Sequence, residues 1–390
     1  MLPEVALVTL YVIWAVAFDG THFFATYSRT VLDPDFRREH SALLRASMTV
    51  FVAGPALLAV ALSVGGDEAI RAMSFALNRF AVAWAYYHLC RQHYGVIALY
   101  RRKQADPDAS AWRLETLMML SGFAYPFLHA LIHLEEPLSG AELQWIGAAG
   151  WRATSQVLLA VGGLAAAGAS WLRASERGRT STTARLALFG LARVTLAIGL
   201  TLPLGEAVGW FRILEHAESG LMAVFGLSVV ARMLHGVGAR GPIQWPKWAM
   251  LAGALATHHS ILRLEGVPVL LAMLALTLFH NVQYHRIVRF FSVSQYSGRG
   301  PDHFARRATQ SPVLFWIAGL AFSTAVLATK ICLLAVRDDE IATYMVVAAI
   351  WGIPLHHYVL DASIWRPSHS RQVRQMLHTE TSLGVRTGDA

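Results

Sequence analysis

The chain has 390 residues, of which 55% are hydrophobic and 15% are charged, and its mean hydropathy is +0.43. Soluble domains carry about 25% charged residues, so the composition excludes an ordinary soluble protein. The net charge of +8 does not indicate nucleic-acid binding, because the arginines and lysines lie in short loops between apolar runs, where positive charge sets membrane topology.

The apolar runs predict an all-α, polytopic integral membrane helix bundle with about eleven transmembrane helices, since crossing the hydrocarbon core takes about 20 apolar residues. Lipid offers no partners for backbone polar groups, so each span is expected to be helical. In chain order, the expected spans are 4–24, 46–65, 72–100, 112–134, 146–172, 184–204, 208–233, 247–263, 267–290, 312–335 and 341–361. Charged residues near 72–79 and 206–219 leave the count at roughly ten to twelve.

The loops between these spans alternate in charge. Arginines follow the first, third and fifth spans, whereas acidic pairs follow the second and fourth. The positive-inside rule then places the N-terminus outside and the C-terminus in the cytoplasm, with the chain in the inner membrane if the source is bacterial. Residues 1–366 are expected to form one transmembrane domain and residues 367–390 a polar, disordered cytoplasmic tail. A cleaved signal peptide is not expected, because the start of the chain lacks a basic segment.

Histidine is the residue type that indicates function. Of the seventeen histidines, those within or at the ends of the expected spans are His22, His88, His93, His129, His133, His258, His259, His280, His285, His356 and His357. An ionisable residue within a span is costly and suggests function. Neutral imidazole suits iron, copper, zinc and nickel, so we expect these histidines to bind a metal or a haem. The alternative for each motif is packing, a hydrogen bond or a lipid headgroup contact.

The spacing of the histidines decides which of them can meet on one helix. His129 and His133 lie one turn apart on the same face, a spacing that can chelate a metal. Neighbours in the pairs His258-His259 and His356-His357 point about 100° apart, so one member can bind while the other braces a different partner. His88 with His93, and His280 with His285, are five residues apart and cannot face one metal without a kink or a dinuclear site. The sequence therefore leaves one site or two open.

Three polar residues stand close to these histidines in sequence. Asp361 lies four residues after His357, Gln92 four after His88, and Asp19 three before His22. Carboxylates and amides at such positions can accept the N–H of a ligating imidazole and fix its orientation. We expect Asp19, Gln92 and Asp361 to act in this way, although a capping role is an equal alternative for Asp19.

The pattern resembles the integral-membrane histidine-box oxygenases, namely the fatty-acid desaturases, hydroxylases and alkane monooxygenases. His88 with His93, His129 with His133, His258-His259 and His356-His357 look like degenerate boxes of that class. The resemblance implies two iron ions held near the cytoplasmic ends of helices. Asp19-Gly20-Thr21-His22 has a fainter likeness to the bacterial carotene-cleaving membrane dioxygenases, which implies one buried histidine-ligated iron.

The leading hypothesis is thus an O₂-dependent oxygenase, hydroxylase or desaturase that binds iron, with copper or zinc as other metals that fit. Its substrate is expected to be a lipid or isoprenoid from the bilayer, and an electron-donor protein is an expected partner. Two alternatives stay open. One is a haem-binding electron-transfer protein with two imidazoles as axial ligands, and the other is a proton or metal-ion transporter with a histidine relay.

Overall fold

The computed structural model describes residues 4–103, 108–133, 156–158, 210–237, 245–264, 269–296, 298, 300, 306–307, 311–335 and 339–364. Within these ranges the chain is helical and contains no strand, as expected. Five helical segments of this part are long and apolar enough to cross a membrane: Val5–Arg29, Ser41–Arg101, Ile213–His235, Pro312–Ala335 and Glu340–Ile364. The expected span 184–204, most of the span 146–172, and the tail 367–390 lie outside the described residues.

The first expected span is a continuous rod of three helical pieces. It consists of α1 (Glu4–Trp14), the π-helical turn η1 (Ala15–Asp19) and α2 (Gly20–Arg29). Turns of π-helix inside α-helices are rare, and those that occur are often at functional sites. Here the π turn ends three residues before His22. The short helices α3 (Pro34–Glu39) and α4 (Ser41–Ser47) follow.

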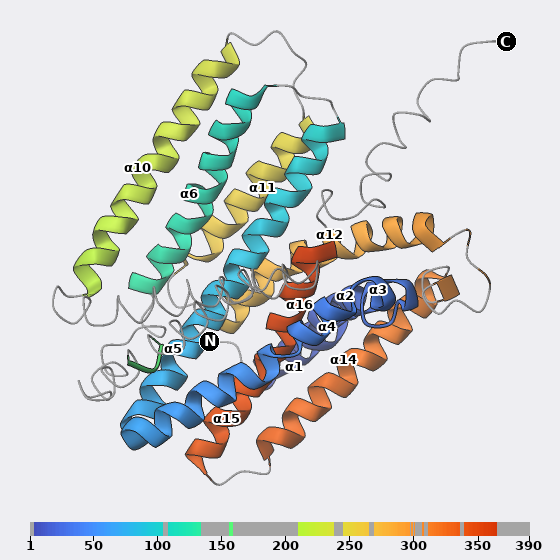
Figure 1. Cartoon of the computed structure of the whole chain (residues 1–390). Coiled ribbons are helices and arrows are strands. Elements are labelled where there is room, and N and C mark those ends of the chain that lie inside the picture. The colour runs from blue at the N-terminus through green and yellow to red at the C-terminus, as the bar shows by residue number, and fades with distance from the viewer. Residues whose placement is uncertain are drawn as a thin grey trace, which may run out of the picture.

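The longest helical segment is α5 (Val50–Lys103), which Gly66 divides into two helices. Gly66 has φ 64°, a conformation that favours glycine. A straight helix of 54 residues would extend for about 80 Å, far beyond the ~30 Å hydrocarbon core. The chain instead turns back at Gly66, which separates the two helices expected at 46–65 and 72–100 (Figure 1).

The remaining helices form two groups that share α5. The first group is α6 (Ala109–His133), α10 (Trp210–Val237) and α11 (Trp245–Ile261), beside the second half of α5 (Figure 1). The second group contains the α1–α2 rod with α12 (Val269–Tyr296), α14 (Pro312–Ala335), α15 (Glu340–Ile350) and α16 (Gly352–Ile364). Both α5 and α12 contact helices of each group, so polar side chains on them can join the two.

Glycines let the helices of the second group approach closely. A Cβ atom at Gly20 would lie 2.4 Å from Oγ of Ser323 on α14, and one at Gly352 would lie 2.9 Å from the Phe51 backbone on α5. Small residues at such crossings allow helix backbones to pack tightly in membranes. Because His22 and His357 follow these glycines along α2 and α16, the close crossings bring both histidines into the interior.

The outer faces of the helices carry large apolar side chains. Val5 is 77% exposed on α1, Leu227 is 70% exposed on α10 and Val313 is 64% exposed on α14. Isolated apolar residues are ordinary on a protein surface, but repeated exposure along helices indicates an apolar contact. These faces suit lipid, which agrees with the apolar composition of the helices.

Candidate metal centre

Three of the expected histidines meet in the interior. His22 on α2, His88 on α5 and His357 on α16 each offer a ring nitrogen within 4.8 Å of the other two. His22 Nε2 and His357 Nε2 are 2.9 Å apart. The three side chains are almost completely buried. Since each comes from a different helix, the group is created by tertiary packing alone.

The nitrogen separations fit ligands of one ion. Imidazole nitrogens bonded to a metal at about 2.0–2.1 Å are about 3.0 Å apart at a right angle and about 3.4 Å apart at a tetrahedral angle. A hydrogen bond between two neutral rings also fits the pair of His22 and His357. His88 Nε2, however, is buried and has no hydrogen-bond partner among the described residues. Buried polar atoms usually have a partner, so this nitrogen is available to a ligand.

Asp361 on α16 lies beside this group and is held by two neighbouring helices. Its carboxylate accepts hydrogen bonds from Gln92 Nε2 on α5 and from the Tyr284 hydroxyl on α12. Its Oδ2 atom is 3.6 Å from His88 Nε2. The Tyr284 hydroxyl oxygen also lies 2.5 Å from Thr26 Oγ1 on α2. The structure therefore brings Gln92 and Asp361 together next to His88.

Tyr284 was not expected as a partner of Asp361. A tyrosine near the end of a membrane span is commonly an interfacial aromatic residue. A usable signal was its spacing, because Tyr284 lies four residues after His280 and so shares a helix face with it. The ring centres of these two residues are 6.2 Å apart.

Asp19 has a different setting from the one expected beside His22. Asp19 is the last residue of the π turn and lines a cavity. It is within electrostatic range of Lys330 on α14. No hydrogen bond between Asp19 and a histidine occurs among the described residues.

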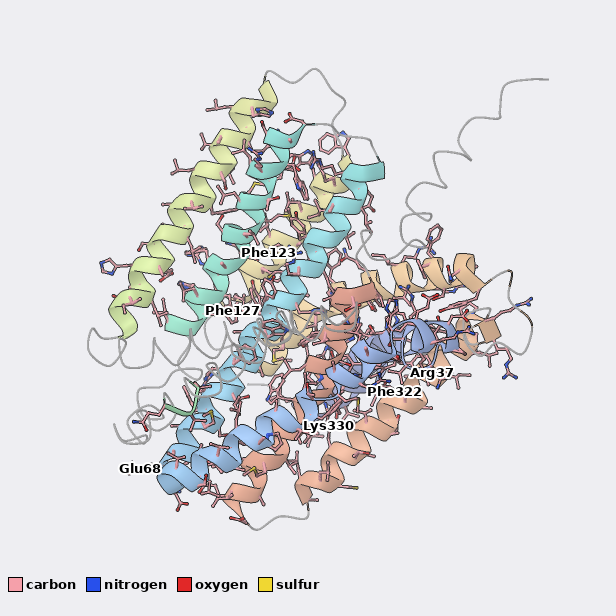
Figure 2. All side chains as sticks on the ribbon, in the orientation of Figure 1. Arg37, Glu68, Phe123, Phe127, Phe322 and Lys330 are labelled. Atoms are coloured by element: carbon pink, nitrogen blue, oxygen red, sulfur yellow. The ribbon has the colours of Figure 1, made fainter. Side chains whose placement is uncertain are left out.

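A cavity of about 600 Å³ opens onto the histidine group. His22, His88 and His280 form part of its wall, and most of the remaining lining is apolar. Phe127 on α6 and Lys330 on α14, both labelled in Figure 2, line it from the two helix groups. Pockets for small organic ligands commonly measure about 300–1,000 Å³, so this space can hold an apolar molecule beside the imidazoles.

His280, His93 and His258 continue the row of imidazoles toward the first helix group. The His280 ring centre is 4.7 Å from that of His22 and 6.1 Å from that of His93. The His93 and His258 ring centres are 5.6 Å apart. His88 and His93 are five residues apart on α5, so their rings point in different directions, as the helix period requires. His88 lies with His22 and His357, whereas His93 faces His258.

Four other expected ligands bind protein groups instead. His259 Nε2 is 2.8 Å from the Gly122 carbonyl oxygen, which lacks its usual helical donor because residue 126 is proline. His285 Nε2 is 3.0 Å from Thr21 Oγ1, His356 Nε2 is 2.9 Å from Ser47 Oγ, and His129 Nδ1 is 2.7 Å from Glu218 Oε1. The side chain of His133 lies outside the described residues.

A separate buried cluster of charges joins α6, α10 and α11 in the first helix group. Lys247 Nζ lies 3.0 Å from both carboxylate oxygens of Glu115, and Arg232 Nε lies 3.0 Å from Oε1 of Glu115. Glu115 and Lys247 are each 1% exposed. In the sequence analysis Lys247 was grouped with the loop charges, no prediction was made for Glu115 or Arg232, and the cluster was not foreseen.

The comparisons with known proteins give no relative to set beside this geometry. The chain matches no protein-family model, and neither the curated proteins nor the solved structures contain a match.

Proposed function

We propose that the chain is a multi-pass membrane metalloenzyme that uses O₂ to oxidise a lipid or isoprenoid. The observation that carries the proposal is the group of three buried imidazoles, with nitrogens within 4.8 Å of one another, two of which, His22 and His88, line a largely apolar cavity. In this proposal the bundle has about eleven spans, an outside N-terminus and a cytoplasmic C-terminus.

His22, His88 and His357 are the proposed ligands. Three imidazoles from rigid helices form an open site, which leaves coordination positions for other molecules. Neutral imidazole ligands suit iron, copper, zinc and nickel, and iron is the choice that fits oxygen chemistry. A bound iron would supply the one-electron and O₂ chemistry that side chains lack.

The surrounding residues have distinct proposed roles. Asp361 lies 3.6 Å from His88 Nε2 and places a negative charge beside the proposed ion, and Gln92 and Tyr284 hold that carboxylate in place. The apolar lining of the cavity accommodates the hydrocarbon part of the substrate and excludes water. Electrons are expected from a separate donor protein, for which the basic cytoplasmic loops are the proposed contact surface.

Elemental analysis of the purified protein in detergent tests the metal part of the proposal. The wild type is expected to carry iron, and His357→Ala is expected to lose it. His356→Ala is the matched control, since the neighbouring ring contacts Ser47 and Tyr27, and it is expected to keep the metal. Wild-type protein without a transition metal, or full retention in His357→Ala, contradicts the proposal. A Soret band in the same preparation would indicate haem instead.

A product assay tests the reaction. Proteoliposomes that contain the protein, a reductant and candidate lipids or isoprenoids are incubated with and without O₂, and extracts are compared by mass spectrometry. Added oxygen or lost hydrogen atoms are expected only with O₂ and only in protein with intact His22, His88 and His357. Uptake of protons or metal ions into these vesicles, without a new product, would favour a transporter.

A further inference from the structure

His93 on α5 and His258 on α11 face each other at the junction of the two helix groups. Both are 1% exposed, their ring centres are 5.6 Å apart and their planes are at 82°. Two imidazoles on one ion, with metal–nitrogen bonds of about 2.0–2.1 Å and tetrahedral to trigonal angles, have ring centres about 5.3–5.6 Å apart. The observed separation therefore agrees with two ligands of one metal.

The hydrogen bonds around His258 leave a lone pair on its Nε2 atom. The Tyr86 hydroxyl is 2.8 Å from the Phe123 carbonyl oxygen, which can only accept. With that proton donated, the Tyr86 oxygen accepts from His258 Nδ1–H at 2.7 Å. The lone pair then lies on Nε2, which is buried and has no hydrogen-bond partner among the described residues. Such an outer partner commonly fixes the tautomer of a metal-binding histidine.

His93 shows the same arrangement from the other side. Its Nδ1 atom is buried and also has no hydrogen-bond partner within the described ranges. The Gln283 side chain on α12 interacts with this ring, and an amide oxygen that accepts from Nε2–H leaves the lone pair on Nδ1. Phe123, labelled in Figure 2, packs against both rings, with ring centres 5.8 Å from His93 and 4.7 Å from His258.

From these two lone pairs we infer that His93 and His258 bind a second transition-metal ion, of the class that prefers neutral imidazole. His280 is the next imidazole along the row, with its ring centre 6.1 Å from that of His93. The same ring is 4.7 Å from His22, so the second ion lies next to the first. The second site rests on the proposed function, because it makes the same centre dinuclear.

Metal stoichiometry tests the second site without any assay of activity. Purified protein is stripped with a chelator, loaded anaerobically with Fe²⁺, freed of excess metal and analysed for iron per chain. We expect about two ions in the wild type and about one in His93→Ala and in His258→Ala. The matched control is His259→Ala, one residue along the same helix, whose ring binds the Gly122 carbonyl; it is expected to keep both ions.

A conservative variant guards against loss of metal through misfolding. Tyr86→Phe keeps the aromatic ring and removes only the hydroxyl that holds His258, so the affinity for one ion is expected to fall by about 10–100-fold while the other is unchanged. Size-exclusion profiles that match the wild type show that each variant is folded.

The outcomes separate the two proposals. One ion in the wild type, lost in His357→Ala and kept in His258→Ala, overturns the second site and leaves the proposed function intact. Two ions that both persist in folded His258→Ala also overturn it. No ion in the wild type overturns the proposed function and the second site together.

Discussion

Two regions of this protein bury polar side chains, and they do so in opposite ways. In the first helix group, Glu115 is matched by Lys247 and Arg232 at 3.0 Å. In the second, His22, His88 and His357 bring ring nitrogens within 4.8 Å of one another, and His88 Nε2 has no hydrogen-bond partner among the described residues. A cluster in which opposite charges are paired can hold helices together by itself. A cluster of neutral imidazoles is expected to gain stability from a cation bound between them.

The two clusters are similarly buried but suggest different roles. The charge cluster suggests a role in stability, and the imidazole cluster is the proposed metal site. The charge cluster is reinforced by Trp248, whose ring centre is 5.0 Å from the Arg232 guanidinium carbon and 5.4 Å from Lys247 Nζ. Asp361, the acidic residue beside the three imidazoles, accepts hydrogen bonds from Gln92 and Tyr284, and its Oδ2 atom is 3.6 Å from His88 Nε2. The following predictions test whether the first cluster governs stability and the second governs metal binding.

The largest effect is expected for Glu115→Gln. It leaves the buried ammonium of Lys247 without this carboxylate, and breaking a buried ion pair on one side costs about 3–5 kcal/mol. Unfolding of the detergent-solubilised protein, followed by circular dichroism, measures the loss, and the iron content of the folded fraction should not change. Adding Lys247→Met removes the buried ammonium that the first change leaves without its carboxylate, and it should recover part of the stability. A drop in iron content in the folded single variant would show that the two clusters are not independent.

Asp361→Asn is expected to weaken metal binding and to change stability much less. Loss of the negative charge beside the ion is expected to cost about 10–100-fold in affinity, as for other groups that support metal ligands, which equals about 1.4–2.7 kcal/mol. Competition with a chelator measures the affinity. Asp339→Asn is the control, because Asp339 caps α15 at the surface, and it should bind metal like the wild type. Equal affinities for wild type and Asp361→Asn would remove the proposed role of this carboxylate.

His259→Ala is expected to lower the free energy of unfolding by about 1–2 kcal/mol, because it strands the Gly122 carbonyl oxygen. The double variant with Pro126→Ala restores a backbone N–H four residues after Gly122 and should regain part of the loss. Thermal unfolding in detergent measures both. If His259→Ala instead loses metal, His259 belongs with the ligands and the distinction drawn between it and His258 fails.

The smallest effect is expected at Asp108, which precedes α6 outside the helical spans. The side-chain hydrogen bond with His235, followed by the backbone N–H of Ala111, lowers the pKa of this carboxyl from 3.8 to about 2. A lowered folded-state pKa contributes stability that is complete above the unfolded pKa and is lost as pH falls through the folded one. The difference in unfolding temperature between wild type and Asp108→Asn should therefore hold above about pH 5 and shrink toward pH 2. A difference that grows with acidification would contradict this.

Much of the helical framework could be predicted from the sequence. The spans expected at 112–134, 208–233 and 312–335 match α6, α10 and α14 within a few residues, because long apolar runs must be helical in lipid. The break at Gly66 lies between the expected spans 46–65 and 72–100, where acidic residues indicated a loop. The charge cluster at Glu115 could not be foreseen, since its cations lie more than a hundred positions away along the chain.

The candidate site was predictable only in part. The helix period predicts that His258 and His259, and likewise His356 and His357, contact different partners, because adjacent side chains point about 100° apart. It could not say which member of each pair lies with the other imidazoles. That depends on how each helix is rotated against its neighbours.

The sequence by itself determined that this is an apolar, helical chain with an unusual supply of imidazoles in its helices. Only the tertiary structure decided that His22, His88 and His357 converge while His129, His259, His285 and His356 bind protein groups. The reason is physical: spacing fixes directions within one helix, whereas the crossings at Gly20 and Gly352 fix which directions from different helices meet.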